Sequence, residues 1–351
     1  FSLPFIVMTS QMRLVEVAES LGITKEDIVK DIWEKGYHTF KREDVTIYVI
    51  SQTIQPRITK EGEQGKHSDY TYVIHPPGHW NFIRMLGISG ILAELKRKGI
   101  LFVFHSNMNN PAGMVDDVLK GLFYNEIEKA RKEGIPVPLS MFLLGENRGE
   151  KGGLLSNVAY EDGRKILQLV EGIALPKEEK SLIEALTAKE LAPEQEKLLS
   201  NKNMPLDKES RMRIFKELFP YFNSATFMLY VDGLMDLFSL PENYDRRLEF
   251  EEIVKRVDTI TAQLPIYMDI KETVDITDRS KKIIAYQFER IYGDITKIAS
   301  WVPLVIDRDV HFLPIKSEAD LDEDKISKLG KRLTGFFKQS SSPIVSLNIP
   351  A

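Results

Sequence analysis

Residues 99–113 read GILFVFHSNMNNPAG, and this stretch decides the fold class. The run Ile100–Phe104 is entirely apolar, and it ends abruptly in His105 and a group of small polar residues that includes Asn107 and Asn109. A strand that ends in side-chain amides is typical of the edge of an α/β sheet where ligands bind, beyond the carboxyl ends of the strands. The alternative is a set of Asx turns that satisfy only the local backbone.

The sequence on both sides of this stretch alternates between strand and helix patterns. Short apolar runs rich in β-branched residues predict strands at residues 3–10, 44–51, 100–105 and 137–144. Apolar residues at helical spacing predict helices at residues 13–22, 82–99 and 114–134. This alternation predicts an α/β fold with a mixed, mostly parallel sheet flanked by helices.

The pattern changes after Gly153. Residues 152–175 predict a β-meander with EDG as its turn, and the Lys- and Glu-rich residues 177–215 predict a helical surface insertion.

The chain opens within a predicted strand and closes on SSPIVSLNIPA, which reads as the start of another strand. We therefore expect material to be missing at both ends.

Composition excludes several classes of protein. The 351 residues are 43% hydrophobic and 28% charged, with a formal net charge of −5 and no cysteine. Without cysteine, neither a disulfide framework nor a thiolate metal site can form. No basic stretch predicts nucleic-acid binding, and no apolar run approaches the roughly 18 residues of a membrane span. We expect a cytoplasmic protein with no nucleic-acid or membrane partner.

Several short segments could carry chemistry, although each also has a purely structural interpretation. HPPGHW, residues 75–80, combines two prolines with Gly78 and His79 just before a predicted helix, whose free N–H groups suit phosphate oxygens. A rigid turn that begins the helix explains it equally well. EKGG at 150–153 and FNSAT at 222–226 could be ordinary turns, and Lys316 of FLPIK could be a surface cation or a phosphate clamp.

The order of these segments is more informative than any one of them. FIVMTS, QTIQPRI, PPGHW, SNMNN, EKGG, YFNSAT and FLPIKSEADL follow one another along nearly the whole chain. In this order the chain resembles the UTP–sugar-1-phosphate uridylyltransferases, and most closely those that act on glucose 1-phosphate. The resemblance implies a GT-A-like, Rossmann-related sheet. It also implies transfer of uridylyl from UTP to a sugar 1-phosphate, with release of pyrophosphate and with Mg²⁺ as cofactor.

The resemblance also implies site roles at matched positions. For the nucleotide, Gln52 matches the residue that reads the uracil edge, Gly78 the glycine that lets the backbone approach, and Asn107 lies in a nucleotide-contacting segment. His79 matches the residue that contacts the sugar phosphate, and Lys316 the lysine that holds phosphates.

Three further positions complete the implied site. Gly152 and Asn223 match positions that line the sugar pocket. Asn109 stands where the family has its metal-binding aspartate. Residues 1–335 would form the nucleotidyltransferase domain, and residues 336–351 a linker or the start of a C-terminal β-helix.

The chain departs from the family pattern at four points. The family's Gly-rich triphosphate loop lies upstream of the first matched strand, Asn109 replaces the aspartate, Trp80 follows His79, and Ala225 replaces an asparagine. Trp80 could stack on a base or block the pocket, and Ala225 removes an expected sugar contact. We expect a uridylyltransferase. The alternatives are an impaired pseudoenzyme that binds a nucleotide sugar, or a nucleotidyltransferase with another nucleotide or sugar.

Overall fold

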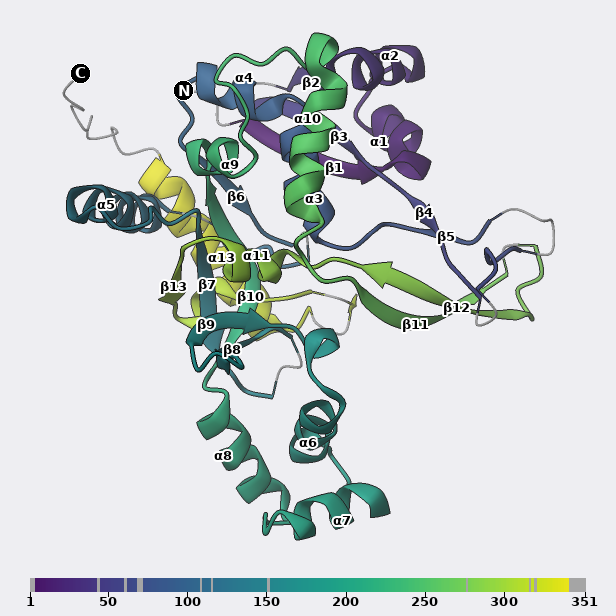
Figure 1. Ribbon diagram of the computed structural model, residues 1–351, viewed down its shortest axis with the longest axis vertical. Helices are drawn as coiled ribbons and strands as arrows, with labels where there is room; N and C mark the ends of the chain where they lie inside the picture. Colours follow the sequence, from purple (N-terminus) through teal and green to yellow (C-terminus); the bar gives the residue numbers. More distant parts are fainter. Residues whose placement is uncertain are drawn as a thin grey trace. The chain divides into compact units, whose positions relative to one another are not determined.

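The computed structural model describes residues 4–42, 45–59, 62–67, 72–107, 109–114, 116–149, 152–275, 277–315, 317–318 and 321–340. The chain forms two compact units, Phe1–Leu101 with Val231–Ile298 and Phe102–Tyr230 with Ala299–Ala351. Both units mix helices and strands, so the predicted α/β class is confirmed (Figure 1).

The first unit contains a three-stranded sheet, several helices and a separate hairpin. Its elements are β1 (Pro4–Ser10), α1 (Leu14–Ser20), α2 (Lys25–Lys35), β2 (Tyr37–Arg42), β3 (Val45–Gln52), β4 (Gln55–Pro56), β5 (Ile74–His75), α3 (Trp80–Ile88), α4 (Ile91–Arg97), α9 (Val231–Leu237), α10 (Arg246–Thr261), β11 (Tyr267–Val274), β12 (Lys282–Glu289) and α11 (Ile295–Ile298). The sheet has the order β1-β3-β2, and Leu14, Ala18 and Ile28 of α1 and α2 pack on its central Val49.

One predicted helix of this unit is two helices. The segment 82–99 is divided between α3 and α4 because Gly90 has a φ of +82°, outside the helical region. Gly99, predicted to end the segment, does follow α4 and has a φ of +68°.

The second unit is built around a six-stranded sheet. Its elements are β6 (Phe102–His105), α5 (Asp117–Glu133), β7 (Ser140–Glu146), β8 (Leu154–Ala159), β9 (Lys165–Val170), α6 (Lys177–Thr187), α7 (Pro193–Asn201), α8 (Lys208–Leu218), β10 (Tyr221–Tyr230), β13 (Trp301–Val305), α12 (Arg308–His311) and α13 (Glu323–Ser340). The order is β13-β7-β10-β8-β9, with β6 paired to β10 as well. Apolar residues of α5 pack on β7 and β10.

The prediction of a mostly parallel sheet is wrong. Among the described strands, only β1 with β3 and β7 with β13 pair in parallel. The central strand β10 runs antiparallel to β6, β7 and β8. The chain reverses at the turn between β8 and β9, which pair antiparallel, and the connection through α6–α8 then brings β10 into the sheet in the direction of β9.

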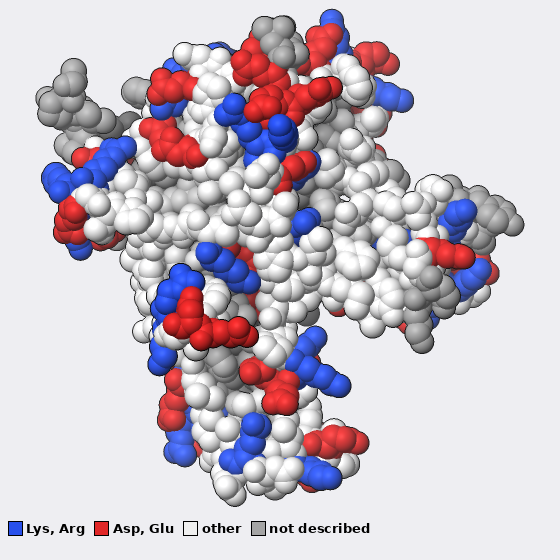
Figure 2. All heavy atoms as spheres, viewed as in Figure 1, with Lys and Arg blue, Asp and Glu red and all other residues white. Residues whose placement is uncertain are grey.

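The predicted helical insertion is present as α6, α7 and α8. Ile183, Leu186, Leu199 and Phe215 form its core together with Phe222 of β10. On the face seen in Figure 2, blue and red side chains alternate over these helices, as expected for a solvated surface. Helix α13 continues to Ser340, past the predicted boundary at residue 335, and residues 341–351 lie outside the described part.

Candidate functional site

The asparagine loop, residues 106–113, follows β6 in the second unit and is bonded to a segment two hundred residues later. The side chain of Asn110 is only 3% exposed; its Oδ1 accepts from Leu313 N at 2.9 Å, and its Nδ2 donates to His311 O at 3.1 Å. Ile315 N donates to Asn109 O at 2.6 Å. The predicted SNMNN and FLPIK motifs therefore lie side by side, and the side chains of Asn107 and Asn109 are exposed.

The other two motifs of this unit join the same end of the sheet. Ser106 Oγ lies 3.3 Å from Thr226 Oγ1 of the FNSAT segment, within hydrogen-bond distance. Asn223 N donates to Gly153 O at 2.7 Å, so the two predicted sugar-pocket residues, Gly152 and Asn223, are neighbours. Gly153, not Gly152, is the crowded glycine: a Cβ on it would lie 2.4 Å from Glu171 Oε1.

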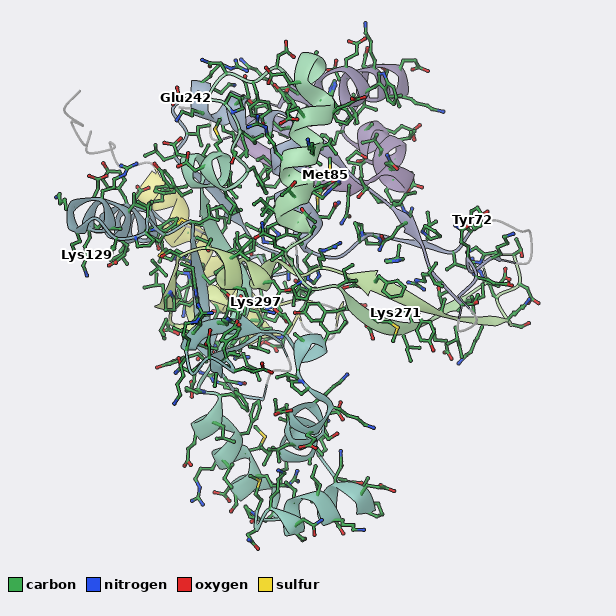
Figure 3. The ribbon with its side chains drawn as sticks, viewed as in Figure 1. Tyr72, Met85, Lys129, Glu242, Lys271 and Lys297 are labelled. Carbon is green, nitrogen blue, oxygen red and sulfur yellow. The ribbon has the colours of Figure 1, made fainter. Side chains whose placement is uncertain are left out.

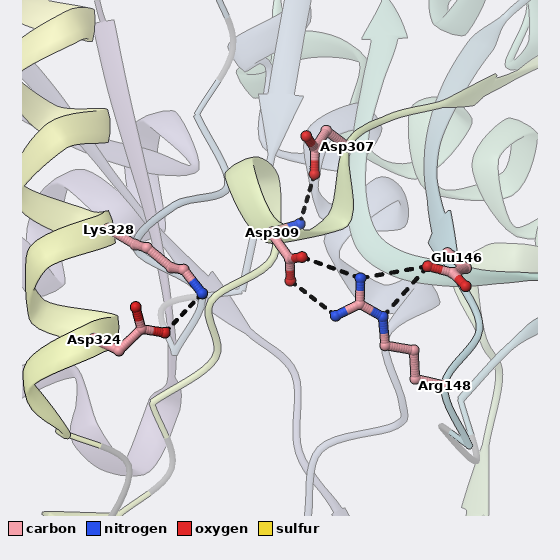
Figure 4. Close-up of polar contacts among 6 residues, drawn as sticks. All are labelled: Glu146, Arg148, Asp307, Asp309, Asp324 and Lys328. Atoms are coloured by element: carbon pink, nitrogen blue, oxygen red, sulfur yellow. Dashed lines mark hydrogen bonds and ion pairs between the residues drawn. The ribbon is translucent and has the colours of Figure 1, made fainter.

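Charged side chains fasten the loop before EKGG to the segment before FLPIK (Figure 4). Arg148 forms two hydrogen bonds with Asp309, at 3.0 and 3.1 Å, and also reaches Glu146 at the end of β7. The hydrogen bond from Arg148 lowers the pKa of the Asp309 carboxyl below its usual value. A planar guanidinium that binds a carboxylate through two bonds fixes orientation as well as distance.

In the first unit, the predicted nucleotide and sugar-phosphate residues also approach one another. Gln52 is the last residue of β3, and the next residue, Thr53, donates from Oγ1 to Asn81 Oδ1 at 3.2 Å, just after the PPGHW turn. The exposed His79 packs its ring against Tyr292 with 5.6 Å between centroids.

Gly78 is required by the fold itself. It has a φ of +94°, and a Cβ would lie 2.3 Å from Arg290 O. Trp80 N donates to that same oxygen, and Arg290 N donates to Pro77 O. The turn is thus pinned against the end of β12, and a ligand is not needed to explain the glycine.

The prediction that Trp80 could stack on a base or block a pocket is wrong. Its side chain is 1% exposed, and its Nε1 donates to Thr261 Oγ1 of α10 at 3.0 Å. As the first residue of α3, Trp80 faces inward onto α10, where Arg84 also pairs with Asp258. It is a core residue.

Mg²⁺ as cofactor stays a prediction. Within the described residues, no group of three or more His, Cys, Asp or Glu side chains is placed to hold a metal ion. The described asparagines of the loop offer neutral amides, whereas Mg²⁺ prefers one or two carboxylates together with substrate phosphates. Lys316, the predicted phosphate clamp, lies outside the described residues, although its neighbour Ile315 is bonded to the asparagine loop.

Sequence reasoning did not single out two residues that organise the site. Asn110 is the last residue of SNMNN, and no local pattern marks it, rather than the exposed Asn109, as the buried amide of the loop. Arg148 precedes EKGG by a few residues and carried no signal, because its partner Asp309 is distant in sequence.

No helix in the described part of the chain combines the length and the hydropathy needed to cross a bilayer.

Comparison with known proteins supports the resemblance. Residues 4–133 match the family model of the UTP–glucose-1-phosphate uridylyltransferases. A curated relative, UTP–glucose-1-phosphate uridylyltransferase 2 of Dictyostelium discoideum, is 28% identical over 141 residues, which is 38% of this chain and 25% of the relative. This chain therefore aligns with a quarter of that protein.

Solved structures share the fold at low identity. A UDP-glucose phosphorylase of Trypanosoma brucei has a TM-score of 0.55 at 18% identity, covering 92% of this chain and 56% of its own. A Leishmania major UDP-glucose pyrophosphorylase variant, solved with UDP-glucose, has a TM-score of 0.51 at 19% identity, covering 91% and 54%. The chain thus spans little more than half of these structures. The sequence-based resemblance is confirmed: part of this chain, residues 4–133, is similar to the UTP–glucose-1-phosphate uridylyltransferases.

Proposed function

We propose that this chain carries substrate-binding parts of a UTP–sugar-1-phosphate uridylyltransferase. The observation that supports this most is the grouping of motifs within the second unit. Hydrogen bonds join the asparagine loop to the segment ending at Ile315 and to Thr226, and join Asn223 to the glycines of EKGG. Segments so far apart in sequence converge at one end of a sheet, where α/β folds bind ligands.

The reaction needs little side-chain chemistry. An oxygen of the sugar 1-phosphate attacks the α-phosphorus of UTP, a new P–O bond forms, and the bond to the pyrophosphate oxygen breaks. Binding and alignment of the two substrates therefore supply most of the rate. We assign the uracil edge to Gln52, whose amide has both a donor and an acceptor, the sugar phosphate to His79, and the sugar hydroxyls to Asn223. Glucose 1-phosphate is the proposed acceptor.

The second candidate function is a nucleotide-sugar-binding protein without turnover. Asn109 favours it, because an exposed neutral amide stands at the position of the family's aspartate and no acidic cluster is found among the described residues. A carboxylate about 4 Å from a cation is worth about 4 kcal/mol at an effective dielectric of about 20, so its loss would slow a metal-assisted reaction by orders of magnitude.

The test measures turnover and binding separately. Pyrophosphate release from UTP and glucose 1-phosphate with Mg²⁺ is measured on the full chain, and UDP-glucose binding is measured by calorimetry. Turnover supports the enzyme. Binding without turnover, with turnover restored in Asn109→Asp, supports the second function. If the chain shows no binding and no turnover, both proposed functions are overturned.

The base-reading role has its own matched variants. Gln52→Glu loses the amide donor and should weaken UTP and UDP-glucose binding by about 1–3 kcal/mol, roughly 10- to 100-fold. Gln263→Glu makes the same change at an exposed position after α10 and should leave binding unchanged. Lys316→Ala should also cause a large loss of nucleotide affinity. Equal affinities for the two glutamine variants would refute the assignment of Gln52.

A further inference from the structure

Among the described strands, the hairpin of β11 and β12 in the first unit is paired along one side only. The two strands pair antiparallel along their full length, and the far side of β12 is bridged to Ile58 through Tyr286. Among the described strands, none pairs with the other side of β11. Ile270 N donates to the side chain of Asp269 at 2.9 Å, so this backbone N–H belongs to the outer edge. An edge of this length is a template for another strand.

One face of the hairpin carries several exposed apolar side chains. Met268, Ile270 and Val274 lie on this face of β11 together with Glu272, and Ile270 is 59% exposed. Ile284 of β12, opposite Glu272, is 63% exposed. In Figure 2 the surface over this hairpin is mainly white, with charged side chains gathered toward its tip. A row of apolar side chains beside an open strand edge marks an association surface.

The opposite face of β11 carries one charge of each sign. Asp269 and Lys271 are two residues apart, and Lys271 Nζ lies 2.6 Å from Asp269 Oδ2. Figure 3 labels Lys271 on the hairpin. Two identical strands can pair antiparallel about a two-fold axis normal to the sheet. Each odd-numbered residue then faces an odd-numbered residue of the partner, and each even-numbered residue an even-numbered one. The register is therefore decided by which residue lies on the axis.

We propose that β11 pairs with β11 of a second copy of this chain, with Ile270 on the two-fold axis. In this register Asp269 faces the partner's Lys271 and Lys271 faces the partner's Asp269, which gives two opposite-charge cross-strand pairs. With Asp269 or Lys271 on the axis instead, like charges would face each other. Of these three registers, only the one centred on Ile270 places opposite charges across the interface.

The same register satisfies the backbone and the apolar face. The N–H of Ile270 exchanges its bond to Asp269 for a bond to the C=O of the partner's Ile270, which leaves the carboxylate for the partner's Lys271. The two hairpins become one four-stranded sheet, in which the two copies of Ile270 are neighbours and Met268 faces the partner's Glu272. This inference does not depend on the proposed reaction.

Charge exchange tests both the interface and its register. Sedimentation velocity over a wide concentration range should show a monomer–dimer equilibrium for the unmodified chain. Asp269→Lys and Lys271→Asp each place like charges opposite each other, and each should weaken self-association roughly tenfold or more. An equimolar mixture of the two should form heterodimers, because opposite charges then face each other at both positions. The double exchange should dimerise again.

The controls separate the interface from folding. Lys30→Asp makes a matched charge change on the exposed surface of α2 and should leave association unchanged. Ile270→Pro removes an N–H that faces outward, so it should abolish dimers while circular dichroism stays native. A chain that is monomeric at every concentration overturns the proposal. A dimer that the exchanges leave unaffected also overturns it, because association would then use another surface.

Discussion

Removing the side chain of Asn110 should loosen the contact between the asparagine loop and the segment around Leu313. In Asn110→Ala, the N–H of Leu313 and the C=O of His311 both lose their described partner. Each bond contributes about 1 kcal/mol net, and a buried group left unpaired costs about 1–3 kcal/mol, so we expect a loss of about 2–4 kcal/mol. A unit of this size should then melt roughly 4–16 °C lower.

Asn109→Ala is the matched control, since its side chain is exposed and its described bond, from Ile315, uses the backbone oxygen. It should change stability by no more than about 0.5 kcal/mol. Hydrogen exchange followed residue by residue should show the amide of Leu313 exchanging roughly 30-fold faster, or more, in Asn110→Ala only, and the amide of Ile315 protected in Asn109→Ala. Equal losses in the two variants, or an unchanged rate at Leu313, would refute the reasoning.

Three other substitutions give distinct expectations. Gly78→Ala forces a Cβ to 2.3 Å from Arg290 O and should cost about 2–5 kcal/mol in urea unfolding, whereas Gly99→Ala, with φ +68° and no atom within 4 Å, should cost about 1–2 kcal/mol. Ala225 has a φ of +58°, so Ala225→Gly should raise stability by up to about 1 kcal/mol; a clear loss would contradict the strain. Burial and a nearby arginine lower the pKa of His311, so stability should fall as pH drops from above 6.5, and His311→Asn should flatten that dependence.

The sequence was informative wherever a signal is local. β1, β3, β6 and β7 follow from short apolar runs, and α5 from its spacing. No local pattern predicts that SNMNN lies beside FLPIK, because the two motifs are two hundred positions apart; the family resemblance only gives residues of both motifs a role in one site. Strand direction in the second unit was not predictable, since it depends on where β10 enters the sheet after α6–α8. The Arg148–Asp309 pair was not predictable either, because its two residues are distant in sequence.

The structure also changes the weight of the departures from the family pattern. Trp80 lies in the core against α10, so its ring is not available to stack on a base. Ala225 lies at a bulge in β10 and has a left-handed φ, which Asn tolerates better than Ala. An alanine in place of the family's asparagine therefore strains the backbone and also removes a side-chain amide. Among these three residues, only Asn109 is exposed, and our proposal gives it the position of the family's aspartate. The choice between enzyme and binding protein therefore depends mainly on one amide, and Asn109→Asp is the substitution that decides it.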